Sequence, residues 1–92
     1  MPSYPSFAAL QANEVVGVDY RIRVRRGPSG IAIMAIHGGG IEPGTTEVAD
    51  AVAEQWHTFY TFSGLKPSGN AVLHISSRKF DEPAGRLIAQ DS

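Results

Sequence analysis

The chain has 92 residues, with eight lysines and arginines against nine aspartates and glutamates, three histidines and no cysteine. This length suits one domain at most, and the nearly balanced charge gives no electrostatic reason to expect nucleic acid or an anionic membrane surface as a partner. The lack of cysteine excludes disulfides, thiolate metal sites and cysteine nucleophiles, so any metal must be bound by His, Asp or Glu.

The start of the chain shows no targeting or membrane segment. Residues 1–6 lack a basic region followed by a long apolar run, and no apolar stretch in the sequence reaches membrane-spanning length. We therefore expect no export signal and no membrane partner. A protein of this kind is expected in the cytoplasm or released by lysis.

The N-terminal part predicts one helix and one strand. Residues 7–13 favour a short helix that ends at Asn13. Residues 18–24 alternate apolar and polar side chains, which is typical of a strand with one solvated face. We interpret the basic cluster here as that polar face, with a phosphate-binding patch as the alternative; its members are Arg21, Arg23, Arg25 and Arg26.

The middle of the chain predicts a second strand and a helix. After a turn rich in glycine and proline, residues 30–36 form an apolar run that predicts a strand buried on both faces. We expect this strand to form an antiparallel hairpin with residues 18–24. Residues 45–56 place apolar side chains at helical spacing and predict an amphipathic helix, capped by Gly44 or Thr45.

The C-terminal part predicts two short strands and a last helix. Residues 57–62 and 71–75 are apolar or aromatic runs closed by turn residues, and both predict strands. A helix is expected over residues 84–90, with Asp81 as its cap and Pro83 in its first turn. Strands that alternate with helices indicate an α/β fold, with a layered mixed sheet and flanking helices.

The segment from His37 to Glu47 is the strongest functional signal. His37 and Glu42 flank three glycines directly after an apolar strand, and functional groups of open α/β sheets lie just past strand ends. An imidazole and a carboxylate can bind zinc if the glycines let the backbone fold both inward. A phosphate cradle, an oxyanion hole or a plain tight turn are the alternatives, although the loop lacks the P-loop and nucleophile-elbow motifs.

Four ordered motifs resemble the phage and bacterial poly-γ-glutamate hydrolase family. They are HGGGIEPGTTE at 37–47, FSGLKPSGN at 62–70, LHISS at 73–77 and FDEP at 80–83. The resemblance covers roughly residues 15–90 and rests on motifs specific to that family. It implies zinc-dependent hydrolysis of the γ-linked amide of poly-γ-glutamate, on a fold similar to zinc carboxypeptidases, of which this chain would form the N-terminal half.

The resemblance also implies roles for individual residues. His37 and Glu42 match the first two zinc ligands of the family. The third ligand is a histidine in a further strand, and we expect it, with the catalytic base, beyond Ser92. Residues 1–92 are therefore expected to form a single truncated domain that is inactive alone. His74 is expected to bind substrate or to polarise its carbonyl beside the metal, with zinc ligation as the less favoured alternative.

A polyanionic substrate requires cations near the cleft. We expect these from basic residues in or after the loops at the edge of His37, with ordinary surface charge as the alternative; they are Lys66, Arg78, Lys79 and Arg86. In the family an arginine commonly follows the FDEP motif directly, whereas Arg86 stands two positions later in this sequence. That departure weakens the assignment of Arg86 as a substrate clamp.

Two main hypotheses follow from the sequence. In the first, the chain contributes part of the zinc site of a γ-glutamyl amidohydrolase. In the second, it is an inactive domain that folds or oligomerises without zinc, and a homo-oligomer would cover the exposed sheet edge. Acyl transfer through Ser76 or Ser77 ranks last, because no nucleophile elbow surrounds them.

Overall fold

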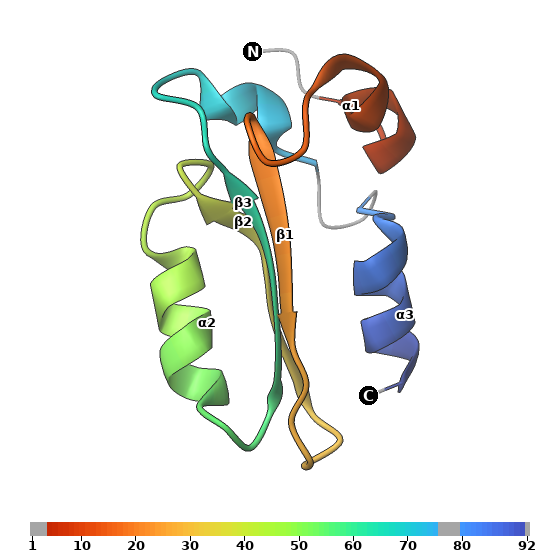
Figure 1. Ribbon diagram of the computed structural model, residues 1–92, viewed down its shortest axis with the longest axis vertical. Coiled ribbons are helices and arrows are strands. Elements are labelled where there is room, and N and C mark those ends of the chain that lie inside the picture. The colour runs from red at the N-terminus through yellow and green to blue at the C-terminus, as the bar shows by residue number, and fades with distance from the viewer. Residues whose placement is uncertain (1–3, 76–79, 92) are drawn as a thin grey trace.

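The computed structural model describes residues 4–75 and 80–91 as a three-stranded mixed sheet between helices (Figure 1). One helix, α2, covers one face of the sheet, and α1 and α3 lie on the opposite side (Figure 1). This confirms the α/β class with a mixed sheet and flanking helices. The elements are α1 (Phe7–Asn13), β1 (Tyr20–Arg25), β2 (Ala32–Gly39), α2 (Thr45–Ala53), β3 (Thr58–Gly64), the 3-10 helix η1 (Asn70–Leu73) and α3 (Pro83–Asp91).

The predicted hairpin between the first two strands is wrong. The strand order is β1-β3-β2, with β1 antiparallel and β2 parallel to β3. All seven residues of β3 are buried, because the central strand of the sheet is covered on both faces and paired on both edges. The connection between β1 and β2 is long enough to pass the start of β3, where the Ser29 amide donates to the Trp56 carbonyl at 2.9 Å.

Strand β2 is longer and more exposed than the sequence predicts. It extends through His37 and the first two glycines to Gly39, so the glycine-rich segment begins within the strand. Most of its residues are only partly buried, because β2 is the outer strand of the described sheet. The expectation of a strand buried on both faces therefore fails for the described residues.

The helices α1 and α2 follow their predicted starts. The Ser6 hydroxyl accepts a hydrogen bond from the Ala9 amide at 3.3 Å and caps α1. Gly44 is the N-cap of α2, which ends at Ala53 rather than at Trp56. The next residue, Glu54, has a φ of 49°, a left-handed conformation that stops the helix. Trp56 lies outside the helix and is 55% exposed, not part of its apolar face.

The strand predicted at residues 71–75 is wrong, because a 3-10 helix, η1, occupies most of this segment. Gly69 adopts a left-handed φ of 79°, and the Asn70 side chain bonds both the amide and the carbonyl of Lys66. These contacts turn the chain immediately before the apolar run. Leu73 and Ile75 are still fully buried, because a short apolar run can reach the core as helix or as strand.

The helix α3 is confirmed, but its cap is Glu82 and not Asp81. The buried Glu82 carboxylate accepts from the Ala84 and Gly85 amides at 3.1 and 2.9 Å, and from the Tyr60 hydroxyl at 2.7 Å. Burial, with this hydrogen bond, raises the pKa of Tyr60 far above its usual range. Asp81 instead accepts from the Phe7 amide at 2.8 Å, which ties α1 to the start of α3.

The core has two unequal parts on the two faces of the sheet. The larger, on the side of α1 and α3, contains Phe7, Leu10, Tyr20, Tyr60, Phe62, Leu73, Ile75 and Ile88. The smaller, under α2, contains Ala35, Ala49, Ala53 and Phe59. Among the described residues no helix has the length and apolarity needed to cross a membrane.

Candidate metal centre

A β-bulge near the end of β2 places His37. Three steps along β2, from Ala35 to Gly38, correspond to two steps along β3, from Thr61 to Ser63. One extra residue in a strand bends it and changes the direction of its side chains. The His37 side chain is 14% exposed, so the ring is mostly enclosed.

The two ring nitrogens of His37 have different partners. Nε2 lies 2.7 Å from the Ile75 carbonyl oxygen, and Nδ1 lies 2.8 Å from Glu42 Oε1. A carbonyl oxygen can only accept, so Nε2 bears a hydrogen, and in the neutral ring Nδ1 then has a lone pair. This lone pair faces a carboxylate oxygen, and two such acceptors need a proton or a metal ion between them. The donor set therefore fits a metal ion.

His74 lies beside this pair. Its ring stacks on that of His37, with centroids 3.9 Å apart and an interplanar angle of 20°. Ligand atoms of His37, Glu42 and His74 all lie within 4.8 Å of one another, and together they form a candidate metal-binding group. However, imidazole lone pairs lie in the ring plane, so two stacked rings do not point at one ion. His74 would have to rotate to share a metal with His37.

Each of the three glycines after His37 is required by a close contact. A Cβ at Gly38 would lie 2.1 Å from a threonine hydroxyl, and one at Gly39 would lie 2.5 Å from the Gly64 carbonyl oxygen. A Cβ at Gly40 would lie 2.4 Å from Nδ2 of the Asn70 side chain. Only Gly39 of the three also has a left-handed φ, of 59°. The triple glycine thus serves chiefly to pack the loop against its neighbours.

A cluster of hydroxyl groups lies under the loop. Thr46 Oγ1 accepts from the Gly39 amide at 3.1 Å and lies 2.9 Å from Thr61 Oγ1. Thr61 Oγ1 in turn lies 3.0 Å from Ser63 Oγ. The cluster joins the loop to the central strand. Sequence reasoning missed it, although hydroxyl residues at alternate positions of β3 and the paired threonines after Gly44 were visible signals.

The predicted substrate-binding cations are in different surroundings. Lys66 Nζ forms an ion pair with Glu14 at 2.8 Å, and these side chains are only 24% and 7% exposed. Hydrogen bonds from Lys66 and from the Tyr4 hydroxyl lower the pKa of Glu14. Arg86 is exposed on α3 and, with Ile36 among others, lines a hollow of about 180 Å³. The predicted cations Arg78 and Lys79, like Ser76 and Ser77, lie outside the described residues.

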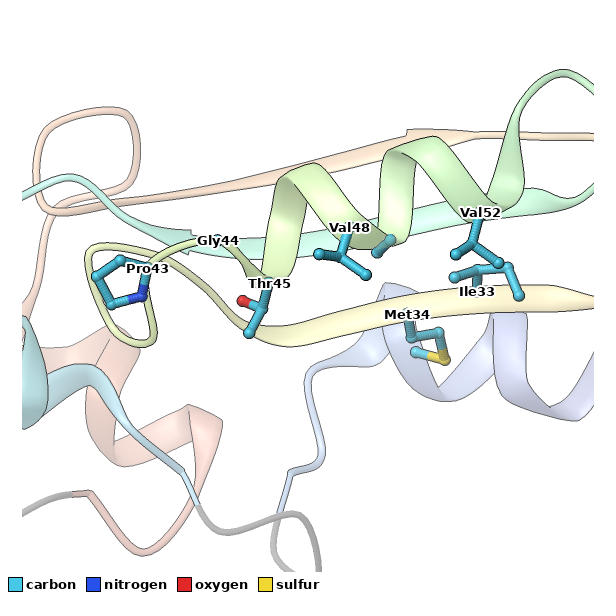
Figure 2. A pocket seen from close by; sticks show the side chains of 8 residues that line it. Ile33, Met34, Pro43, Gly44, Thr45, Val48 and Val52 are labelled. Carbon is cyan, nitrogen blue, oxygen red and sulfur yellow. The ribbon is translucent and has the colours of Figure 1, made fainter.

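A larger apolar hollow, of about 490 Å³, lies between α2 and β2. Figure 2 shows Val48 and Val52 on the side of α2 that faces strand β2, which carries Ile33. Its lining includes Pro43 from the loop after His37 and Thr45 at the start of α2, but neither His37 nor Glu42. The hollow is therefore a neighbour of the candidate metal site and not the site itself.

Comparisons with known proteins show the family and the fold of the chain. A family model described as poly-gamma-glutamate hydrolase matches residues 4–92. The chain is 46% identical over 80 residues to the UPF0714 protein YndL of Bacillus subtilis (strain 168), covering 87% of this chain and 31% of that protein. It is 38% identical over 85 residues to YmaC of the same organism, covering 91% of this chain and 35% of YmaC.

Two solved structures resemble the chain. A bacteriophage poly-γ-glutamate hydrolase matches with a TM-score of 0.90 and 43% identity, covering 96% of this chain and 43% of that one. A zinc-free, apo form of YndL matches with a TM-score of 0.83 and 44% identity, covering 91% of this chain and 41% of that one. The chain spans about a third of the length of the curated relatives. It belongs to the poly-γ-glutamate hydrolase family.

Proposed function

We propose that this chain provides two zinc ligands, His37 Nδ1 and the Glu42 carboxylate, to an enzyme that hydrolyses the γ-glutamyl amide bonds of poly-γ-glutamate. The observation that supports this most is the pair of acceptors 2.8 Å apart, with the other His37 nitrogen already bonded to the Ile75 carbonyl. A hydrogen bond from the second ring nitrogen to a carbonyl is the usual support of a metal-binding histidine. Family membership supports the substrate.

The residues of this chain would each have a defined task in that reaction. A bound zinc ion supplies Lewis-acid polarisation of the scissile amide carbonyl. Glu42 balances the charge of the ion, and the Ile75 carbonyl fixes the ring of His37. We propose that His74, which stacks on that ring, hydrogen-bonds a substrate carboxylate or carbonyl. The charge of Lys66 is already balanced by Glu14, so we propose Arg86 and Arg78 as the main substrate cations.

Two protein ligands leave a zinc site incomplete, because catalytic sites usually have three. We propose that the third ligand is a histidine of a further strand and that the catalytic base also lies outside the described residues. The whole would be one larger hydrolase domain similar to zinc carboxypeptidases, with residues 1–92 as part of it. The greater length of the relatives and of the matched structures supports this.

The alternative is a domain that folds without zinc and has no activity. One observation is compatible with this alternative. A protonated His37 can form an ion pair with Glu42 at the observed distance of 2.8 Å without any metal. In that case the loop would be a stable ion-paired turn.

Equilibrium dialysis of the purified chain against zinc near neutral pH distinguishes the two. We expect weak zinc binding by the wild-type chain, because two ligands leave the site incomplete. This binding should be lost in His37→Ala and in Glu42→Gln, since each removes a ligand. His57→Ala is the matched control, because His57 bonds Ser29 in the connection between β1 and β2 and lies outside the candidate metal group. Zinc bound equally by all four proteins, or by none, would reject the proposed site.

A further inference from the structure

The hydroxyl of Thr45 contacts the backbones of both candidate zinc ligands. Its Oγ1 lies 3.0 Å from the His37 carbonyl oxygen and 2.9 Å from the Glu42 carbonyl oxygen, and it donates to both. The Glu42 amide also donates to the His37 carbonyl, at 2.9 Å. A single hydroxyl hydrogen is thus shared between the two residues whose side chains meet at the metal site.

We infer that Thr45 is a positioning residue that sets the spacing between His37 and Glu42 before any metal binds. This inference rests on the proposed function, because it concerns the same pair of ligands. Of the residues between the ligands, Gly38 and Gly39 are held in β2, and the Gly40 amide donates to the Gly64 carbonyl at 3.1 Å. The part from Ile41 to Glu42 lies beyond the sheet, and a segment that is not held in place must lose conformational freedom each time it binds an ion, which weakens binding.

Thr45 does not act as an ordinary helix cap. A capping hydroxyl accepts a hydrogen bond from a backbone amide in the first turn of its helix. The cap position of α2 is Gly44, which has no side chain, and the Thr45 hydroxyl donates backwards to two loop carbonyls instead. Its bonds therefore stabilise the loop between the ligands and not the first turn of α2.

The neighbouring Thr46 anchors the same loop to the central strand β3. Its hydroxyl holds the Gly39 amide and is bonded to Thr61 in the central strand. Thr61 is fully buried, so this part of the loop cannot move without breaking a buried polar contact. Thr46 holds the middle of the loop, and the Thr45 hydroxyl then fixes the distance between the two ends of the loop, His37 and Glu42.

The test compares zinc affinity in Thr45→Val and Thr45→Ser, measured by titration with zinc in competition with a chromophoric chelator. Valine keeps the branched shape but removes the hydroxyl, so we expect roughly tenfold weaker binding, as for other groups that orient metal ligands. Serine keeps the hydroxyl and should restore binding to within about twofold of wild type. Unchanged affinity in Thr45→Val would overturn the inference.

Thr58→Val is the matched control. Thr58 Oγ1 accepts from the Gly27 amide at 3.1 Å, at the start of β3 and away from the loop. This variant also loses one hydroxyl contact, so its denaturation midpoint should resemble that of Thr45→Val while its zinc affinity matches wild type. An equal loss of zinc affinity in both variants would show a general structural effect and reject a positioning role.

A second measurement needs no metal. The Thr45 hydroxyl links the carbonyls of His37 and Glu42, so Thr45→Val should let the loop open more often. Hydrogen exchange at the Glu42 amide should then be at least about fivefold faster, with the β3 amides unchanged. Unchanged exchange at Glu42 would overturn the inference even if no protein bound zinc. Faster exchange at the Glu42 amide in Thr45→Val, together with no zinc binding by the wild type, would support the positioning role of Thr45 and reject the proposed zinc site. The failure of the inference and the failure of the proposed function are therefore distinguishable.

Discussion

The two faces of the central strand β3 differ in chemistry. Tyr60 and Phe62 belong to the large core under α1 and α3, where Phe62 stacks on Tyr20 at a centroid distance of 5.2 Å. On the other face Thr61 and Ser63 form the hydroxyl cluster under the glycine-rich loop. The comparison indicates that one face supplies most of the stability and the other supplies the support for the candidate metal site.

The largest expected effect comes from removing the central aromatic residue of the first face. Phe62→Ala should cost about 3–5 kcal/mol, because Phe62 is fully buried and also packs edge-to-face against Phe7 and Phe80. Small domains have little stability in reserve, so we expect a largely unfolded protein by circular dichroism and urea titration. A native-like unfolding curve for this variant would contradict the conclusion that the face of β3 under α1 and α3 supplies most of the stability.

Glu82→Gln tests the polar anchor of the same face. The substitution replaces a carboxylate that accepts from two amides of α3 and from Tyr60 by a weaker neutral acceptor. We expect a loss of about 1–3 kcal/mol in the free energy of unfolding, measured with urea. The control Glu47→Gln lies exposed in the first turn of α2 and should change stability by less than about 0.5 kcal/mol.

Tyr60→Phe tests the pH dependence of this anchor. The pKa of Tyr60 is raised, chiefly by burial, whereas in the unfolded chain it lies near its ordinary value of 10.0. The contribution to stability is therefore complete below about pH 10 and is lost as the pH rises above it. We expect the wild type to lose stability more steeply than the variant in urea titrations above about pH 10. Parallel pH profiles would argue against a buried, protonated Tyr60.

A smaller effect on stability is expected on the hydroxyl face. Thr61→Val removes one buried hydroxyl but leaves Thr46 within 3.4 Å of Ser63 Oγ, so we expect a loss of about 1 kcal/mol. Zinc affinity should fall more than in Glu82→Gln, although the fold is perturbed less. If zinc affinity followed stability across both variants, the two faces would not have separate roles.

The smallest effect on the unfolding free energy is expected at the exposed side of α2. Val48 and Val52 are 64% and 55% exposed beside the outer strand β2. Val52→Lys should leave stability within about 0.5 kcal/mol of wild type, but should reduce any self-association seen by sedimentation. A wild-type chain that is monomeric at all concentrations would contradict the predicted homo-oligomer.

The sequence predicts local structure better than it predicts the order of the strands. Alternation, helical spacing, apolar or aromatic runs and cap residues together locate α1, β1, α2, β3 and α3 to within a few residues. The hairpin error arises because pattern alone does not reveal that β3, later in the chain, fits between the two earlier strands. The error at residues 71–75 arises because four or five apolar residues contain too little periodicity to separate strand from 3-10 helix.

The candidate site was likewise predictable where it depends on local sequence and not where it depends on contacts between distant segments. The proximity of His37 and Glu42 follows from their places around three glycines in the loop, and the structure brings them together. The stacking of His74 on His37 and the Ile75 carbonyl contact depend on how η1 returns to the sheet, which no local pattern encodes. Likewise, the pairing of Lys66 with Glu14 is a contact between distant segments.

The outer strand β2 has a consequence for how the sheet can be extended. Its outer row of backbone amides and carbonyls has no strand partner among the described residues, and apolar side chains flank it on both faces. The opposite edge, β1, presents exposed arginines, which discourage pairing with a second sheet. Of the two edges of the described sheet, β2 would therefore accept an added strand more readily than β1.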